Sequence, residues 1–458
     1  MTQGLVRTAE ETTPIIPLIT DQLSDWLAHE PAATQHWVRA HNFKADADTF
    51  LVVPDDEGNV RYVLAGVKEP LHIWSLAYLP LQLPAGTYAI QADWDAQTLQ
   101  EVAIGWGLAC YQFDRYKKMD APAALLKLDD AVDADHIFRV TDAIYLTREL
   151  VNVPAEDMGP SHLAVVAKEV ADTCGAEYRE VVGDDLLKEN YPAIHAVGRA
   201  AANKPRLIDL RWGNPEHPKL TLVGKGVCFD TGGLDIKPYS SMKLMKKDMG
   251  GAALMLGLAQ LIMQSKLPVR LRLLIPAVEN NIDSNAFRPQ DILSTRKGLT
   301  IEVGSTDAEG RLILADALAE ADEEKPDLLI DAATLTGAAR VALGAELPAL
   351  FANDDATAME IQQTSMDVFD ALWRLPLWEV YEENIDSPVA DVANSPSTSF
   401  GGAIHAALFL QRFVEHAAAW VHIDTMAWNL KARPGRPAGG EAFGLRALYT
   451  MLAERFKG

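Results

Sequence analysis

The chain has 458 residues, of which 48% are hydrophobic and 23% are charged, and its 41 Lys and Arg residues against 64 Asp and Glu residues give a net charge of −23. This length favours two or three domains, and the composition is that of a globular protein rather than a disordered or fibrous one. Such an acidic surface repels phosphate backbones and anionic lipids, so nucleic acid and membrane partners are disfavoured.

The three cysteines, Cys110, Cys174 and Cys228, are an odd number without close spacing, which argues against a disulfide framework and a cysteine-based zinc site. Residues 1–23 lack a basic region followed by an apolar stretch, so we expect no signal peptide. The apolar, charge-free run at residues 249–265 is too short and glycine-rich for a membrane span. We therefore expect a cytoplasmic protein.

In the first third of the chain, strand-like and helix-like segments alternate. Residues 49–53 and 60–67 flank a turn-forming segment and are predicted to form a β-hairpin. Residues 96–116 and 134–151 carry apolar residues at helical spacing, and the second segment is predicted to be a connector helix.

A break rich in Pro and Gly follows at residues 152–160. We place the domain boundary there, with an N-terminal α/β domain over residues 1–155 and the domain that carries the chemistry over residues 156–458.

The second domain alternates apolar strand candidates with helix candidates. Strands are predicted at residues 207–212, 219–227, 269–277, 328–333, 349–352 and 420–424. Helices are predicted at residues 250–264, 312–324, 359–373, 404–415 and 441–455. Several strands are continuous apolar runs, which is typical of buried parallel strands. The predicted fold class is α/β: a mostly parallel mixed sheet covered by helices, preceded by a smaller α/β domain.

Ligands bind at the carboxyl ends of strands in open α/β sheets, and two polar segments, residues 223–251 and 305–311, lie at such ends. Neither contains a P-loop, and the chain has no H-E-x-x-H or G-x-S-x-G motif. The triplet Asp230-Thr231-Gly232 matches that of aspartic proteases, which need two such aspartates. The chain has no second copy, so a dimer would have to supply it.

Four carboxylates, Asp230, Asp248, Asp307 and Glu309, are candidates to converge in these segments. Such a group stays ionised only when cations neutralise it, and two divalent metal ions about 3.5 to 4 Å apart would do so and form a hydrolytic site. An aspartate after a buried strand is also a common cap or turn residue, so the residues alone leave both interpretations open.

Three basic residues belong to the same segments. Of Lys225 and Lys237, either could lose its proton beside metal ions and act as a ligand, and the one that stays charged could stabilise an oxyanion. Arg311 stays protonated, so it can hold an anion such as carbonate that acts as a base. The pair Lys246-Lys247 is predicted to face solvent. His405 and His422 lack partners at ligand spacing and are predicted to be structural.

At these residues the chain resembles the leucyl aminopeptidase (cytosol aminopeptidase) family of dinuclear metallopeptidases, from about Tyr145 to the C-terminus. The likeness is to a bacterial branch of the family. The matching segments are residues 223–230 with Gly232, Gly233 and Lys237, residues 245–253, residues 306–312 with 315–318, and residues 332–337. Ser305 and Cys228 stand where Asn and Thr are usual.

The resemblance implies a role for each candidate residue. Asp230 and Glu309 would bridge two metal ions, Lys225 and Asp248 would complete the tighter zinc site, and Asp307 would hold the site that exchanges zinc, manganese, magnesium or cobalt. Lys237 would polarise the scissile carbonyl, and Arg311 would position a bicarbonate that takes the proton from a bridging water. Contacts to the substrate would come from Met245, Thr334, Leu335 and Gly337.

The resemblance also implies an aminopeptidase that removes an apolar, leucine-like residue from the N-terminus of short peptides, and a homohexamer. Trp428 and Asn429 belong to a segment that, if it lines the pocket, would alter the leucine preference. The alternative function is a DNA-binding or regulatory relative with little peptidase role, which the charge of −23 disfavours.

Overall fold

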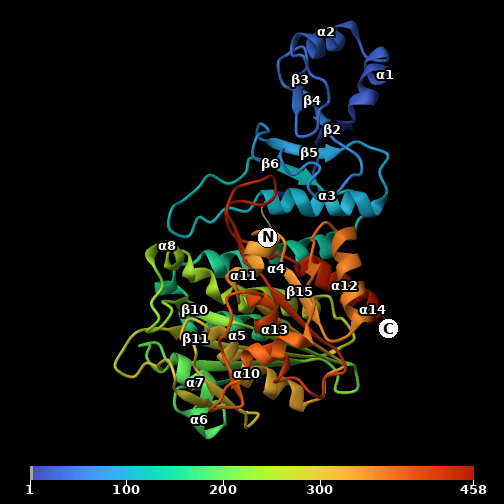
Figure 1. Ribbon diagram of the computed structural model, residues 1–458. Helices are drawn as coiled ribbons and strands as arrows, with labels where there is room; N and C mark the ends of the chain where they lie inside the picture. Colours follow the sequence, from blue (N-terminus) through green and yellow to red (C-terminus); the bar gives the residue numbers. More distant parts are fainter. Residues whose placement is uncertain (1–3, 458) are drawn as a thin grey trace. The chain divides into compact units, whose positions relative to one another are not determined.

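The computed structural model of the chain describes residues 4–457, and the chain divides into two compact units (Figure 1). The first unit contains the chain up to residue 145 and residues 431–438, and the second contains residues 146–430 and the chain from residue 439 on. This division falls within helix α4 (Ala134–Asn152), which matches the helix predicted at residues 134–151. The domain boundary at 155/156 stays a prediction. Within the described range, no helix is long and apolar enough to cross a membrane.

The first unit contains a six-stranded sheet, counted over the described residues, in the order β1-β6-β5-β2-β4-β3. Its strands are β1 (Leu5–Val6), β2 (Thr13–Leu18), β3 (Phe50–Pro54), β4 (Val60–Gly66), β5 (Gly86–Ile90) and β6 (Ala124–Lys127). Its helices are α1 (Leu23–Ala28), α2 (Ala32–Ala40) and α3 (Ala96–Ala109). Strands β3 and β4 pair antiparallel, which confirms the predicted hairpin, and the other neighbours are parallel.

Helix α3 begins where the sequence predicts and ends earlier. The Asp95 carboxylate accepts a hydrogen bond from the Thr98 amide at 2.7 Å, which caps the first turn. The helix ends at Ala109 rather than at Tyr116. Residues 114–118 are exposed and mostly charged, so a longer helix would bury no further apolar surface.

The second unit contains a nine-stranded mixed sheet, again counted over residues 4–457, in the order β16-β15-β18-β14-β9-β11-β8-β7, with β10 also paired to β11. The strands are β7 (Glu177–Val182), β8 (Arg206–Trp212), β9 (Lys219–Gly224), β10 (Gly226–Asp230), β11 (Arg270–Asn280), β14 (Leu328–Ala333), β15 (Ala349–Ala352), β16 (Trp373–Arg374) and β18 (Trp420–Asp424). The β7–β8, β8–β11 and β15–β18 pairs are antiparallel and the others are parallel, so the predicted fold class is confirmed.

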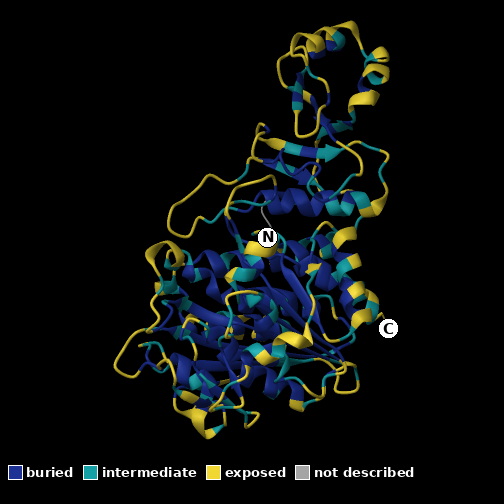
Figure 2. Ribbon diagram, in the orientation of Figure 1, coloured by how far each residue is buried: buried dark blue, intermediate teal, exposed yellow. Residues whose placement is uncertain are grey.

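Helices cover both faces of this sheet. One group is α5 (Pro160–Cys174), α9 (Gly250–Gln264) and α14 (Leu445–Arg455), with α12 (Asp355–Asp367) packed on α14. The other is α7 (Pro192–Gly198), α10 (Glu309–Glu323) and α13 (Gly402–Gln411). The short helices are α6 (Asp185–Lys188), α8 (Tyr239–Met242) and α11 (Gly337–Leu343), with the 3-10 turns η1 (Thr20–Gln22), η2 (Ala155–Asp157), η3 (Met245–Met249) and η4 (Glu379–Ile385). Figure 2 shows the buried residues in the sheet and the inner faces of these helices.

The remaining strands form two small sheets. One consists of β12 (Ile292–Ser294), β13 (Thr300–Glu302) and β17 (Val392–Ala393), and the other of β19 (Trp428–Asn429) and β20 (Gly439–Gly440). The chain reaches the first of these from β11 and then enters α10, so this sheet leads into the second polar segment found in the sequence.

Several predicted helices have different ends in the structure: those predicted at residues 404–415 and 441–455 lie at 402–411 and 445–455. The helix predicted at residues 359–373 ends at Asp367, because Phe369 adopts a left-handed backbone conformation with φ of +53° and the chain then forms β16 beside β15. The helix predicted at residues 312–324 begins earlier, at Glu309. Glu309 and Arg311 therefore lie on the first turn of α10 rather than in the loop before it.

Candidate active site

The first polar segment begins where one predicted strand is interrupted. The strand expected at residues 219–227 divides into β9 and β10 on either side of Lys225, whose amide still donates to the Ala332 carbonyl of β14 at 3.0 Å. The Lys225 side chain is buried and runs across Gly310, where an added Cβ would lie 2.4 Å from Cε and 2.6 Å from Nζ. A side chain at position 310 would therefore displace the end of the Lys225 side chain.

The carboxylates come from four further segments. Asp230 is the last residue of β10, and Asp248 lies in η3, directly before α9. Asp307 lies in the loop before α10, and Glu309 is the first residue of that helix. Glu309 and Asp248 are almost fully buried, whereas the Asp307 side chain is 38% exposed. The site thus has a buried side and an open side.

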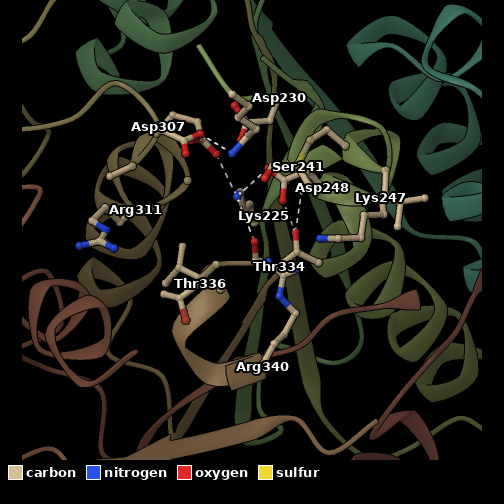
Figure 3. A pocket seen from close by; sticks show the side chains of 18 of the residues that line it. Lys225, Asp230, Ser241, Lys247, Asp248, Asp307, Arg311, Thr334, Thr336 and Arg340 are labelled. Atoms are coloured by element: carbon tan, nitrogen blue, oxygen red, sulfur yellow. Dashed lines mark hydrogen bonds and ion pairs between the residues drawn. The ribbon is translucent and has the colours of Figure 1, made fainter. Parts of the chain in front are cut away.

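Two lysines join these carboxylates in the structure (Figure 3). Lys225 Nζ lies 2.8 Å from Asp248 Oδ2 and 3.0 Å from Glu309 Oε1. Lys237 Nζ lies 2.8 Å from Asp230 Oδ2 and also pairs with Asp307. The five predicted metal ligands are therefore brought together, three carboxylates directly and Asp248 through Lys225.

The crowding of charge shifts the pKa values of these groups. Burial and the neighbouring Asp230 raise the pKa of Glu309 to about 8, and burial and Asp248 raise that of Asp230. Burial would lower the pKa of Lys225, but the carboxylates of Asp248 and Glu309 outweigh it, so this pKa is raised. The same competition raises the pKa of Lys237. The cluster thus carries an excess of negative charge that cations would relieve.

The donor set fits divalent metal ions. Asp230, Asp307 and Glu309 each offer an oxygen atom, and these atoms lie within 4.8 Å of one another. Within the described range, Glu309 Oε2 is buried without a hydrogen-bond partner, which is costly unless a cation or a further donor meets it. Oxygen ligands of this kind suit magnesium, manganese and zinc. This geometry supports the metal interpretation of the four carboxylates over the cap or turn interpretation.

Asp230 is held by hydrogen bonds as well as by Lys237. Its Oδ1 atom accepts from the Asn280 side chain and from the Gly232 amide, both at 2.8 Å. Asn280, at the end of β11, also donates to the Thr306 carbonyl at 3.0 Å, so it ties Asp230 to the loop that carries Asp307.

Arg311 is buried on the first turns of α10. Its NH1 atom donates to the Asn394 carbonyl at 2.7 Å, and its Nε atom is buried without a hydrogen-bond partner among residues 4–457. Burial lowers the pKa of Arg311 to about 10, which leaves it protonated at neutral pH. The guanidinium therefore retains donor capacity for an anion.

All eleven predicted site residues line one cavity of about 440 Å³. They are Lys225, Asp230, Lys237, Met245, Asp248, Asp307, Glu309, Arg311, Thr334, Leu335 and Gly337. The Thr334 hydroxyl donates to Asp248 Oδ1 at 2.7 Å, and the Thr334 carbonyl accepts from Lys225 Nζ at 3.3 Å. The segment after β14 is thus connected directly to the ion-pair cluster.

Sequence reasoning missed several residues that hold the site. Asp424 accepts from the Leu335 and Thr336 amides at 3.0 and 3.2 Å and from the Thr336 hydroxyl at 2.6 Å. Asn394 accepts from the Gly304 amide at 2.7 Å and donates to the Ser305 carbonyl at 2.7 Å. Asp424 ends a predicted strand, a position that could have signalled it, whereas nothing in the sequence singles out Asn394.

The prediction for the lysine pair before Asp248 is wrong. The sequence predicts that the pair Lys246-Lys247 faces solvent, but Lys247 is 3% exposed and lines the cavity, and Lys246 is half-buried and donates to the Asn152 carbonyl. Both lysines lie in η3, which turns inward because it must deliver Asp248 to the cluster. Burial lowers the pKa of Lys247 to about 8, against the opposing effect of Asp248.

The two histidines lie outside the cavity lining. His422 Nδ1 lies 2.6 Å from Asp331 Oδ1 with both side chains buried, and Asp331 Oδ2 accepts from Trp420 Nε1 at 2.8 Å. His405 Nε2 lies 3.2 Å from the Asn384 amide. These contacts agree with the structural role predicted for both.

Comparison with known protein families shows to which family the chain belongs. Residues 145–449 match the model of the "Cytosol aminopeptidase family, catalytic domain", and residues 13–129 match that of the "M17 aminopeptidase, N-terminal domain". The chain belongs to the cytosol aminopeptidase family. It is therefore a metallo-aminopeptidase, and the aspartic protease interpretation of Asp230-Thr231-Gly232 is wrong: the Asp230 carboxylate is bound by Lys237 and Asn280 within a metallopeptidase site.

Individual relatives agree with this assignment. A probable cytosol aminopeptidase of Syntrophotalea carbinolica is 40% identical over 376 residues, which cover 78% of this chain and 75% of the relative. A peptidase B of Cronobacter sakazakii is 40% identical over 377 residues, or 78% and 87% of the two chains.

Solved structures show the same fold. The crystal structure of a cytosol aminopeptidase from Coxiella burnetii matches with a TM-score of 0.96 and 48% identity over 99% of this chain and 100% of that one. The bottromycin maturation enzyme BotP in complex with Mn matches with a TM-score of 0.86 and 32% identity over 97% and 99%.

Proposed function

We propose that the carboxylate cluster holds two divalent metal ions, zinc or manganese, with magnesium or cobalt also accepted at the more open position. Asp230 and Glu309 would bridge the ions, Lys225 and Asp248 would complete the buried site, and Asp307 would hold the exchangeable one. The exposure of Asp307 supports its place on the open side. The observation that carries this proposal is the buried, unpartnered Glu309 Oε2 within a cluster of three converging carboxylates.

The bound ions would supply Lewis acidity and lower the pKa of a water molecule to the neutral range. The protein's own part is positioning and charge. Lys237 would donate a hydrogen bond to the scissile carbonyl oxygen and stabilise the negative charge that develops there. Its present partners, Asp230 and Asp307, place its ammonium group at the mouth of the carboxylate cluster.

Arg311 would hold a bicarbonate ion that accepts a proton from the attacking water. The free Nε donor of Arg311 supports this role, because a buried guanidinium with unused donors is suited to a small anion. Arg311 itself would remain protonated throughout and act as the holder of the base.

The substrates would be short peptides with a free N-terminus, from which the enzyme removes one residue at a time. Met245, Thr334, Leu335 and Gly337 would contact the substrate, and the apolar side chains of Met245 and Leu335 favour a leucine-like first residue. We further propose that the enzyme acts in the cytoplasm as a homohexamer, for which light scattering should give six times the chain mass of 50.0 kDa.

Metal depletion and reconstitution test this proposal. Protein dialysed against a chelator should lose activity on aminoacyl amide reporters and regain it with manganese or zinc, and Lys237→Ala should stay inactive with either metal. Absence of activity with every metal would refute the assignment. Specific DNA binding at physiological salt would favour the alternative regulatory role instead, although the charge of −23 opposes it.

A further inference from the structure

Lys247 is a buried cation without a protein partner. Its side chain lines the cavity, and no hydrogen bond or ion pair joins it to any residue between positions 4 and 457. Burying an ammonium group that no carboxylate contacts directly costs free energy, and an anion bound beside it would recover part of that cost.

Arg340 is a second cation at the same end of the cavity. It lies on α11, and its NH2 atom is 3.4 Å from the position that a Cβ on Gly337 would occupy. Its side chain also has no hydrogen bond or ion pair within the part of the chain that the structure describes. Figure 3 shows Lys247 and Arg340 on either side of Thr334, away from Asp230 and Asp307.

The nearby carboxylates are already engaged. Asp248 pairs with Lys225 and accepts from Thr334, and Asp424 accepts three hydrogen bonds from Leu335 and Thr336. The other cations of the cavity, Lys225, Lys237 and Arg311, all have partners. This end of the cavity therefore holds two cations that no carboxylate contacts directly, Lys247 and Arg340.

We propose that Lys247 and Arg340 bind a carboxylate of the substrate, and that the enzyme therefore accepts peptides with an N-terminal Glu or Asp in addition to apolar residues. The inference rests on the proposed peptidase site, because a substrate anchored at the metal cluster would extend toward Lys247 and Arg340. The methylene groups of these side chains, with Leu244 and Met245, leave the same region able to contact an aliphatic side chain.

A ratio of activities tests this inference. The experiment compares kcat/KM for a Glu amide reporter with that for a Leu amide reporter in the wild type, Lys247→Met and Arg340→Met. We expect each substitution to lower the Glu-to-Leu ratio at least tenfold. The matched control is Lys243→Met, an exposed lysine outside the cavity that should leave the ratio unchanged. A ratio that stays the same in both cavity variants would overturn a role in binding the acidic side chain.

A second pair of substrates identifies the source of the carboxylate. The reporters have no C-terminal carboxylate, whereas the dipeptide Leu-Gly has one and Leu-Gly amide does not. If the variants lower the preference for Leu-Gly over its amide and leave the Glu-to-Leu ratio unchanged, the bound group is the peptide's C-terminus. If the variants change neither the Glu-to-Leu ratio nor the preference for Leu-Gly over its amide, the inference is refuted.

A binding measurement separates this inference from the proposed function. Free glutamate should raise the melting temperature of the metal-loaded wild type more than leucine does, and this difference should disappear in Lys247→Met and Arg340→Met. This result does not require turnover. An enzyme that is inactive on every reporter but retains the glutamate effect would contradict the proposed function alone.

Discussion

The pair formed by Arg148 and Glu441 predicts a large loss of stability from a single substitution. Arg148 Nε and NH2 donate to the two Glu441 carboxylate oxygens, both at 3.0 Å, and Asn429 donates to Glu441 Oε2 at 2.8 Å. The Arg148 side chain is fully buried and that of Glu441 is 6% exposed. In Glu441→Gln, an amide NH2 would face a donor of Arg148 or Asn429, and the buried guanidinium would lose its counter-charge.

The magnitude follows from this geometry. Breaking a buried ion pair by neutralising one partner typically costs about 3 to 5 kcal/mol. The second unit has about 300 residues, and an unfolding entropy of about 2.1 cal/mol/K per residue then converts that cost into a fall in Tm of roughly 5 to 8 °C. Differential scanning calorimetry on metal-loaded protein measures this shift.

Two controls make the prediction specific. Asp172→Asn neutralises an exposed pair, in which Lys168 Nζ lies 2.7 Å from Asp172 Oδ2, and should lower Tm by less than about 2 °C. The double variant Arg148→Met with Glu441→Met should regain most of the stability lost in Glu441→Gln, because neither buried charge remains. A Glu441→Gln protein whose Tm differs from that of the wild type by less than about 1 °C would refute the reasoning.

Three further predictions concern the site and its support. Lys237→Met should lower kcat by roughly 100-fold to 1,000-fold while metal content, measured by mass spectrometry, stays at the wild-type level; retained kcat would exclude its role at the carbonyl. Asn394→Ala should lower the free energy of unfolding by about 1 to 3 kcal/mol, because the hydrogen bonds of Asn394 to Gly304 and Ser305 are lost. The loop that carries Asp307 is then less fixed, so metal binding at the proposed Asp307 site should weaken, which titration calorimetry measures. Burial disfavours the charged form of His422, but the Asp331 carboxylate outweighs burial and raises the pKa of His422 above 6.5. The ion pair with Asp331 therefore stabilises the fold fully below pH 6.5, and this stabilisation is lost as pH rises through the raised pKa. The Tm difference between wild type and His422→Gln should therefore shrink with rising pH, and a constant difference would contradict this.

Much of the fold could be predicted because its elements are determined by local sequence. The apolar runs that form β14 and β18 and the helical spacing of α9 are properties of short windows of sequence. Where a tertiary contact decides, prediction failed: Phe369 ends α12 by turning into the left-handed region so that β16 can pair with β15. Nothing in the local pattern signals that turn.

In the candidate site, too, features set by local sequence could be predicted and features set by tertiary contacts could not. The proposed ligands lie in two compact segments at the ends of predicted strands, so the sequence predicts that Lys225 and Glu309 belong to one cluster. The burial of Lys247 was not predictable, because it depends on how η3 packs against β10 and on the hydrogen bond from Thr334 to Asp248. Likewise, Asn394 acts on a loop 89 residues away, a separation at which spacing carries no information.

Metal stoichiometry of the purified chain tests the central claim most directly. After chelation and dialysis against manganese, the wild type should contain two ions per chain and be active, and Glu309→Gln should bind at most one ion and lose activity. Full activity of the metal-free protein, or two ions bound by Glu309→Gln with unchanged affinity, would contradict a dinuclear site bridged by Glu309.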